Sequence, residues 1–118
     1  MKKEHIVLVE DEPAHAVLLK YNLERYEYIV DHFEDVEMFF AFLQETSVDL
    51  IIISVQFSEK IGHKLCKTIR SLGYLIPILF VTTGTKQEGC ECGNNIDYLI
   101  KPISMEDLFE KVQRLIKK

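Results

Sequence analysis

Five polar residues stand at the ends of short apolar runs that are far apart in the sequence. They are Glu10, Asp11, Ser54, Thr82 and Lys101. If each run is a strand of one parallel sheet, the carboxyl ends of the strands share an edge, and ligands bind outside that edge. Two acids, two hydroxyls and one amine would then face a single crevice. Ser54 would lie at its floor, where a serine hydroxyl is a weak nucleophile unless an adjacent base activates it.

The apolar runs have the composition of buried strands. Residues 49–55 include four apolar residues in succession, three of them β-branched, and this run is too short for a buried helix. Other runs cover residues 6–9, 28–30, 78–81 and 96–100. Helical patterns alternate with the runs, which predicts an α/β fold with a doubly wound, five-stranded parallel sheet and right-handed crossovers.

Apolar residues at helical spacing predict which face of each helix is buried. Four sets are expected to be buried: Ala14, Val17, Leu18 and Tyr21; Val36, Phe39, Phe40 and Leu43; Ile61, Leu65, Ile69 and Leu72; and Leu108, Val112, Leu115 and Ile116. Asp35 and Ser104 are expected to cap two of these helices. Residues 85–95 contain no such set and lie among glycines and asparagines, so the helix between the last two strands should be short or irregular.

The size and charge of the chain limit what it can be. Its 118 residues, 47% of them hydrophobic, suffice for one core, so residues 1–118 are expected to form a single domain. The net charge of −5 argues against binding to nucleic acid or to an anionic membrane. A protein or a cation is the expected partner, and the chain is expected to be a monomer or a weak dimer.

Targeting segments and cysteine chemistry give further expectations. No apolar run approaches the roughly 20 residues of a membrane span, and the N-terminus leads into a strand without the apolar region of a signal peptide. The three cysteines predict free thiols in a reducing cytoplasm. Cys90 and Cys92 lack the spacing of common zinc motifs, and their role stays open. Three of the four histidines, at positions 5, 15 and 32, are interpreted as strand-edge or helix-surface residues.

Over nearly its whole length the sequence resembles the receiver domain of bacterial response regulators. The resemblance rests on motifs in the family's order: residues 7–12 with the acidic pair, 49–53 before the phosphoacceptor, Gly62 in the loop, 77–82 with the switch hydroxyl, and 97–102 with the switch aromatic. It implies the flavodoxin-like receiver fold, with a Lys101–Pro102 peptide bond that is often cis in these proteins.

The resemblance also implies a role for each polar residue. The matching positions are Glu10, Asp11 and the backbone of Gln56 for Mg²⁺, Thr82 and Lys101 for the phosphoryl group, and Thr82 with Tyr98 for the conformational switch. In the family an aspartate completes this site by accepting a phosphoryl group from a kinase histidine. Here Ser54 stands at the acceptor position.

That substitution changes the expected chemistry. The aspartate is an ionised nucleophile at neutral pH, whereas the Ser54 hydroxyl is not. One anionic ligand is also lost from a hard-cation site, so Mg²⁺ binding should be weak or absent and no cofactor is expected. Lys101 is then expected to neutralise the acidic pair directly. Changing Ser54 to aspartate should restore part of the family's chemistry.

Two further departures concern the loops around the site. Ser58 stands where the family usually has a proline, and the stretch between Thr82 and Lys101 is shorter than usual. The second region normally reports phosphorylation to a partner. Both the phosphorylation site and the surface that reports it are therefore altered.

The leading interpretation is a degenerate receiver, a signalling module of the two-component, phosphorelay class that is not an enzyme. It would bind a kinase or another signalling protein without being phosphorylated; the pathway and output stay open. The first alternative is a working phosphorelay receiver that uses Ser54 or a neighbouring acid such as Glu59. The second is an unrelated enzyme or cofactor binder with a flavodoxin-like fold, because fold alone does not determine function.

Overall fold

The computed structural model of the protein describes residues 3–54, 59–82 and 95–117. The strands it contains are β1 His5–Glu10, β2 Ile29–Phe33, β3 Leu50–Ser54, β4 Ile78–Thr82 and β5 Ile96–Ile100. The helices are α1 Pro13–Glu24, α2 Val36–Glu45, α3 Glu59–Ser71 and α4 Met105–Ile116. Within the described residues no helix is long and apolar enough to span a membrane.

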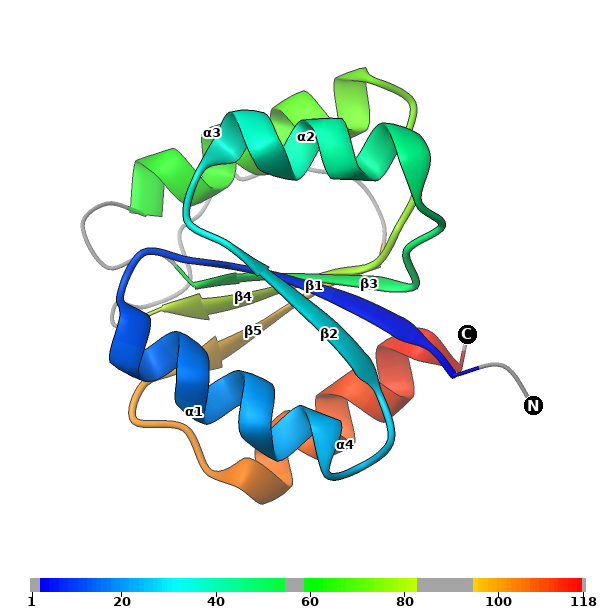
Figure 1. Ribbon diagram of the computed structural model, residues 1–118. Helices are drawn as coiled ribbons and strands as arrows, with labels where there is room; N and C mark the ends of the chain where they lie inside the picture. Colours follow the sequence, from blue (N-terminus) through cyan, green and yellow to red (C-terminus); the bar gives the residue numbers. More distant parts are fainter. Residues whose placement is uncertain (1–2, 55–58, 83–94, 118) are drawn as a thin grey trace.

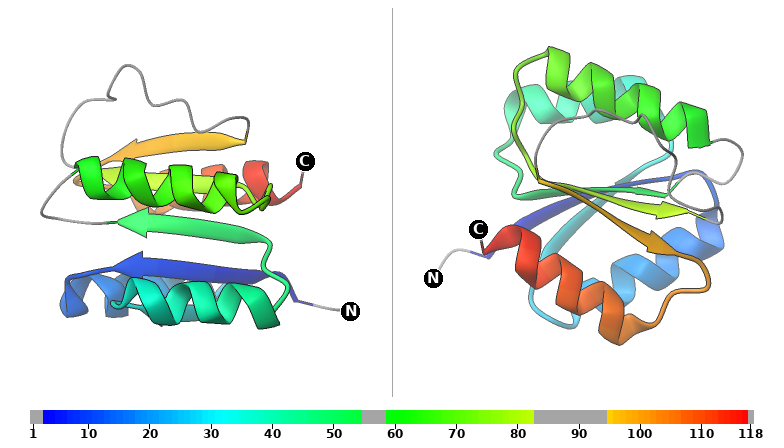
Figure 2. Two further views of the ribbon diagram at one scale, coloured as in Figure 1. Left: turned by 90° about the horizontal axis from the view of Figure 1, so that it is seen from above. Right: turned by 180° about the vertical axis from the view of Figure 1, so that it is seen from behind.

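The strands form one parallel sheet in the order β2-β1-β3-β4-β5, and the arrows in Figure 2 run in a common direction. Helices α1 and α4 cover one face of the sheet, whereas α2 and α3 cover the other (Figure 1). Each layer encloses its own apolar cluster against the sheet. The predicted doubly wound parallel sheet with a flavodoxin-like strand order is confirmed.

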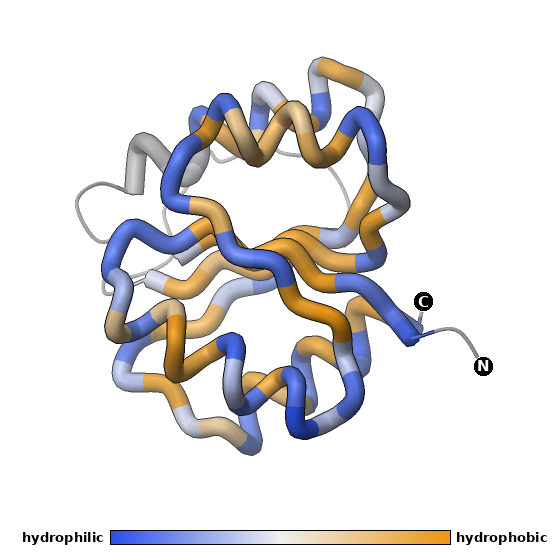
Figure 3. Tube along the Cα trace, in the orientation of Figure 1, coloured by the Kyte–Doolittle hydropathy of each residue, from blue (hydrophilic) through white to orange (hydrophobic). Residues whose placement is uncertain are grey.

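Strand β3 lies at the centre of the sheet and is buried on both faces. Leu50 and Ile52 point into the cluster beneath α1 and α4, whereas Ile51 and Ile53 point into the cluster beneath α2 and α3. Figure 3 shows the hydrophobic residues concentrated along the strands. Because both faces are covered, the strand needs apolar residues at every position, and its first polar side chain, Ser54, falls at its carboxyl end.

The predicted buried face of α1 is wrong. Val17, Leu18 and Tyr21 are 68%, 48% and 61% exposed. The residues that α1 buries are Ala16, Leu19 and Leu23. Both sets have helical spacing, because apolar residues occupy more than one face of this helix, and the sequence pattern alone did not distinguish them.

The other helices follow the prediction at their centres and depart from it at their ends. The predicted residues that are buried are Phe39 and Leu43 in α2, Leu65 and Ile69 in α3, and Leu108, Val112 and Leu115 in α4. Val36 and Leu72 were predicted to be buried, but both are exposed, Val36 as the first residue of α2 and Leu72 directly after α3. Asp35 caps α2 by accepting from the Glu37 N–H at 2.7 Å, and Ser104 caps α4 by accepting from the Asp107 N–H at 3.1 Å.

Several predictions concern residues outside the described part of the chain. These are the short or irregular helix within residues 85–95, the backbone of Gln56, the Ser58 loop, and the thiols of Cys90 and Cys92. Cys66 is described, and it is buried in the cluster beneath α3. The Lys101–Pro102 peptide is cis, as the resemblance implied.

Candidate functional site

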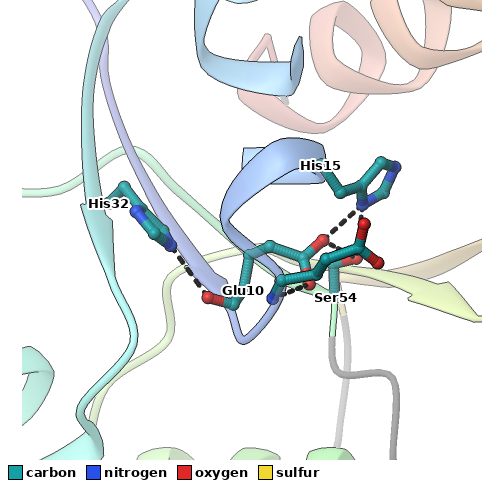
Figure 4. Close-up of polar contacts among 5 residues, drawn as sticks. Glu10, His15, His32 and Ser54 are labelled. Atoms are coloured by element: carbon teal, nitrogen blue, oxygen red, sulfur yellow. Dashed lines mark hydrogen bonds and ion pairs between the residues drawn. The ribbon is translucent and has the colours of Figure 1, made fainter. Parts of the chain in front are cut away.

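The carboxyl ends of β1 and β3 bring Glu10 and Ser54 together. The two residues are register partners in the β1–β3 ladder, and the side chains of both have no exposed surface. The Ser54 hydroxyl donates to Oε1 of Glu10 at 2.7 Å (Figure 4). A buried carboxylate requires hydrogen-bond donors, and this serine provides one.

A second donor reaches the same carboxylate oxygen from α1. His15 lies in the first helical turn, its side chain is 16% exposed, and its Nδ1 contacts Oε1 of Glu10 (Figure 4). The same nitrogen lies 3.5 Å from the Ser54 hydroxyl oxygen. The interpretation of His15 as a surface residue is therefore wrong. The available signal was its position, five residues after Glu10 and within the first turn of a helix that follows β1 directly.

Two backbone contacts complete the surroundings of Glu10. The Glu12 N–H donates to Oε2 of the carboxylate at 3.2 Å. His32, on the edge strand β2, contacts the backbone carbonyl of Glu10 through Nε2 at 2.8 Å. Two histidines therefore approach the same residue, but His15 binds its side chain, whereas His32 binds its main chain (Figure 4).

The hydrogen bonds around Glu10 differ from those of a serine–histidine nucleophile. When Glu10 is ionised its carboxylate only accepts hydrogen bonds, and the Ser54 hydroxyl and Nδ1 of His15 are then both donors to Oε1. A histidine that donates through Nδ1 cannot take the serine proton at that nitrogen. Glu10, rather than His15, is the group positioned to accept a proton from Ser54.

Lys101 does not neutralise the acidic pair as expected. Its Nζ is buried just after the carboxyl end of β5 and finds no hydrogen-bond partner among the described residues. The donors to the Glu10 carboxylate come instead from α1, the turn before it, and β3. The sequence-based expectation failed because it did not include a competing donor from α1.

The predicted switch residues lie on adjacent strands. Thr82 ends β4, and its backbone carbonyl accepts from the Lys101 N–H at 2.7 Å. Tyr98, on β5, stacks on Phe80 of β4 with ring centroids 5.3 Å apart. Both Thr82 and Tyr98 are partly buried. Together with Glu10 and Ser54, the carboxyl ends of four strands thus carry the polar residues predicted for this edge.

The Mg²⁺ that the resemblance implies does not fit the described residues. Mg²⁺ prefers a near-ideal octahedral set of oxygen ligands that includes carboxylates. Both oxygens of Glu10 already accept hydrogen bonds from protein groups, and position 54 supplies a hydroxyl in place of a carboxylate. Among residues 3–54, 59–82 and 95–117, no group of three His, Cys, Asp or Glu side chains could hold a metal ion.

An ion pair near the amino end of β5 ties this strand to α4. Nζ of Lys111 donates to Oδ1 of Asp97 at 2.8 Å, and the Tyr98 N–H donates to the same oxygen at 2.8 Å. Partial burial alone would raise the pKa of Asp97. These hydrogen bonds and the charges of Lys111 and Arg114 outweigh burial, so the pKa of Asp97 lies below its ordinary value.

Comparison with known proteins identifies relatives over almost the whole chain. The family model for the response regulator receiver domain matches residues 6–113. Protein RcaC of Microchaete diplosiphon is 33% identical over 96% of this chain and 18% of its own length. The chain spans about half the length, or less, of the curated relatives it matches.

Solved structures show the same relationship. The receiver domain of a signal transduction histidine kinase from Syntrophus aciditrophicus is 32% identical, with a TM-score of 0.83, over 97% of this chain and 90% of its own. The receiver domain of the sensor histidine kinase PA1611 from Pseudomonas aeruginosa PAO1 is 26% identical, with a TM-score of 0.83, over 99% of this chain and 100% of its own. The latter structure has a magnesium ion coordinated in its active-site cleft.

Proposed function

Because the chain belongs to the response regulator receiver domain family, we propose that it is a signalling module whose output does not depend on phosphorylation. In this proposal residues 1–118 form a single receiver-like domain, and Ser54 occupies the phosphoacceptor position. Glu10, Asp11, Thr82 and Lys101 are the remaining parts of a phosphoryl site, and Thr82 with Tyr98 is the remaining switch pair.

One observation carries this proposal, namely the buried hydrogen bond from Ser54 to Glu10. The 2.7 Å contact occupies the hydroxyl proton, and the Ser54 side chain has no exposed surface for a phosphodonor to reach. An aspartate at this position would supply an ionised nucleophile, whereas the serine supplies a neutral donor. The arrangement therefore favours a single, unmodified state of the site.

Binding to a protein partner is the output that we propose for this module. One of its structural relatives is a domain of a histidine kinase, which supports a kinase or another signalling protein as the partner. The outward face of α1 supports contact with a protein, because Val17, Leu18 and Tyr21 are large and exposed. We propose no binding to nucleic acid or membrane, in accord with the net charge of −5. We also propose a cytoplasmic location, because the three cysteines of the sequence lack the number and spacing of a disulfide framework.

Incubation with acetyl phosphate and Mg²⁺, followed by intact-mass measurement, tests the proposal. We expect the mass of the wild-type protein to stay unchanged, with a phosphorylatable receiver domain as the positive control. A stoichiometric phosphoryl adduct on the wild-type protein would contradict the proposal. Peptide mapping of that adduct would identify the acceptor.

The same hydrogen bond favours one alternative function. Glu10 is placed to accept the Ser54 proton while the hydroxyl oxygen attacks an acyl phosphate; the bond from phosphorus to the carboxylate oxygen would break and the carboxylate would leave. The product would be a phosphoserine, which resists mild base that hydrolyses an aspartyl phosphate. An adduct at Ser54 in the mass experiment would support this alternative over our proposal.

A further inference from the structure

We propose that His15 excludes a divalent cation from this site, by holding the carboxylate oxygen of Glu10 that the cation would need. This inference rests on the proposed function, because it explains why the site stays in one state. It adds a second determinant to the substitution at position 54. Replacing the serine alone would then leave the site closed to Mg²⁺.

The donors around Glu10 leave little room for a metal. A carboxylate offers about four lone-pair positions. Three protein groups use them here, with Ser54 and His15 at Oε1 and the Glu12 N–H at Oε2. Because the side chain is fully buried, these groups replace solvent rather than compete with it. A cation that binds Glu10 must displace at least one of them.

His15 is the donor that differs in kind from the others. The Ser54 hydroxyl and the Glu12 N–H are small donors at the strand end and in the turn, whereas the imidazole is a bulky ring placed over the carboxylate by α1. The start of α1 is set by Pro13 and by the hydrogen bond from the Ala16 N–H to the Glu12 carbonyl at 3.0 Å. The ring is therefore held by a regular helix rather than by an irregular loop.

Lys101 does not offer a substitute for this contact. Within the part of the chain that the structure describes, its Nζ has no hydrogen-bond partner, so the basic side chain that reaches Glu10 comes from α1 and not from the end of β5. A cation that displaced the imidazole would break the contact between His15 and Glu10, and the cation would itself be a charged group in a buried site. This opposes cation entry even when a carboxylate is restored at position 54.

The inference changes the expectation for Ser54→Asp. That single variant should bind Mg²⁺ weakly, because His15 still occupies Oε1 of Glu10. The double variant Ser54→Asp/His15→Leu removes the donor from Glu10 and has carboxylates at positions 10, 11 and 54. Such a set suits Mg²⁺ and is poorly tolerated without it.

The test compares Mg²⁺ affinity by titration of amide NMR shifts near Glu10 and Asp11. We expect Ser54→Asp/His15→Leu to bind Mg²⁺ at least ten-fold more tightly than Ser54→Asp, with a matching Mg²⁺-dependent rise in melting temperature. Ser54→Asp/His32→Leu is the matched control, since His32 contacts the backbone carbonyl of Glu10 and not its carboxylate. This control should bind no more tightly than Ser54→Asp.

Three results would overturn the inference: equal affinities of Ser54→Asp and the double variant, an equal gain in the His32 control, or no Mg²⁺ binding by a folded double variant. If leucine at position 15 prevents folding, phenylalanine keeps the ring volume without the donor and serves the same comparison. Failure of the proposed function is separate, because it is measured as phosphorylation of the wild-type protein. The wild-type protein can be phosphorylated or inert whichever way the two affinities compare.

Discussion

The hydroxyl of Ser54 and the carboxylate of Glu10 meet across a single pair of register partners in the β1–β3 ladder, 2.7 Å apart and fully buried. The contact joins the first and third strands at the edge where the sheet presents its polar residues. Glu10 cannot be solvated by bulk water at this position. The buried Glu10 carboxylate therefore depends on the protein donors around it for its hydrogen bonds.

Changing Ser54 to alanine should destabilise the protein. The variant removes a donor from a buried carboxylate, and hydrogen bonds to charged groups contribute about 1.5–3 kcal/mol. We expect a decrease in the free energy of unfolding of that order, measured by urea denaturation. Ser71→Ala is the matched control, because the Ser71 hydroxyl is exposed and bonds only a helix carbonyl. Equal effects of the two changes would show that the Ser54 contact does not stabilise the fold.

The inward face of α1 can be tested by two neighbouring leucines. Leu19 is fully buried, whereas Leu18 is 48% exposed. Leu19→Ala should lower the free energy of unfolding by about 2–5 kcal/mol, because it opens a cavity beneath the helix. Leu18→Ala should change it by less than about 1 kcal/mol. If Leu18→Ala lowered the free energy of unfolding more than Leu19→Ala, the face predicted from the sequence would be the one that packs against the sheet.

The Asp97–Lys111 pair should make a pH-dependent contribution to stability. The pKa of Asp97 in the folded protein lies below the ordinary value of 3.8 for an aspartate. The contribution is therefore present above that value and is lost as the pH falls through the lower folded pKa. Asp97→Asn should destabilise the protein at pH 7 by roughly 0.5–1 kcal/mol, since the pair is partly exposed.

The difference in the free energy of unfolding between Asp97→Asn and the wild-type protein should shrink as the pH falls below about 3.8. Urea denaturation at each pH measures this difference. Glu110→Gln provides the control. Glu110 also forms an ion pair on α4, with Arg114, but both side chains are more than half exposed. If the difference in the free energy of unfolding for Asp97→Asn stayed constant across the acid range, the pH-dependent contribution of the Asp97–Lys111 pair would be contradicted.

The binding of Mg²⁺ to the wild-type protein should be weak. Two acids, Glu10 and Asp11, stand at the sequence positions where the resemblance implies three with position 54, and the Glu10 carboxylate already accepts hydrogen bonds from protein donors. We expect no saturation of amide shifts near Glu10 and Asp11 at sub-millimolar Mg²⁺. Saturation in that range would mean that the cation displaces His15 readily.

The sequence was sufficient to predict the architecture and the edge of the sheet that carries the site. Runs such as residues 50–53 are apolar at every position because both faces of a central parallel strand are covered, and this pattern has few other interpretations. The polar residues at the strand ends follow from the same logic. Glu10 and Ser54 could be placed at one edge in advance because parallel strands align their carboxyl ends, whereas their hydrogen bond became known only from the structure.

The contacts made by helices could not be predicted in the same way. Helix α1 has apolar residues on more than one face, so the spacing of Val17 and Tyr21 fits a helix as well as that of Ala16 and Leu19 does. The rotation of α1 decides which set is buried, and packing against the sheet sets that rotation. The same rotation places His15 over Glu10, which is why both features were missed together.

The central claim, a site that holds one state whatever phosphodonor is added, is tested most directly by amide NMR of the wild-type protein with acetyl phosphate or beryllofluoride in the presence of Mg²⁺. We predict that the signals of Ser54, Thr82 and Tyr98 keep their positions within experimental error. A donor-dependent shift at Ser54 that propagates to Thr82 and Tyr98 would contradict the account, because it would show a working phosphorylation switch.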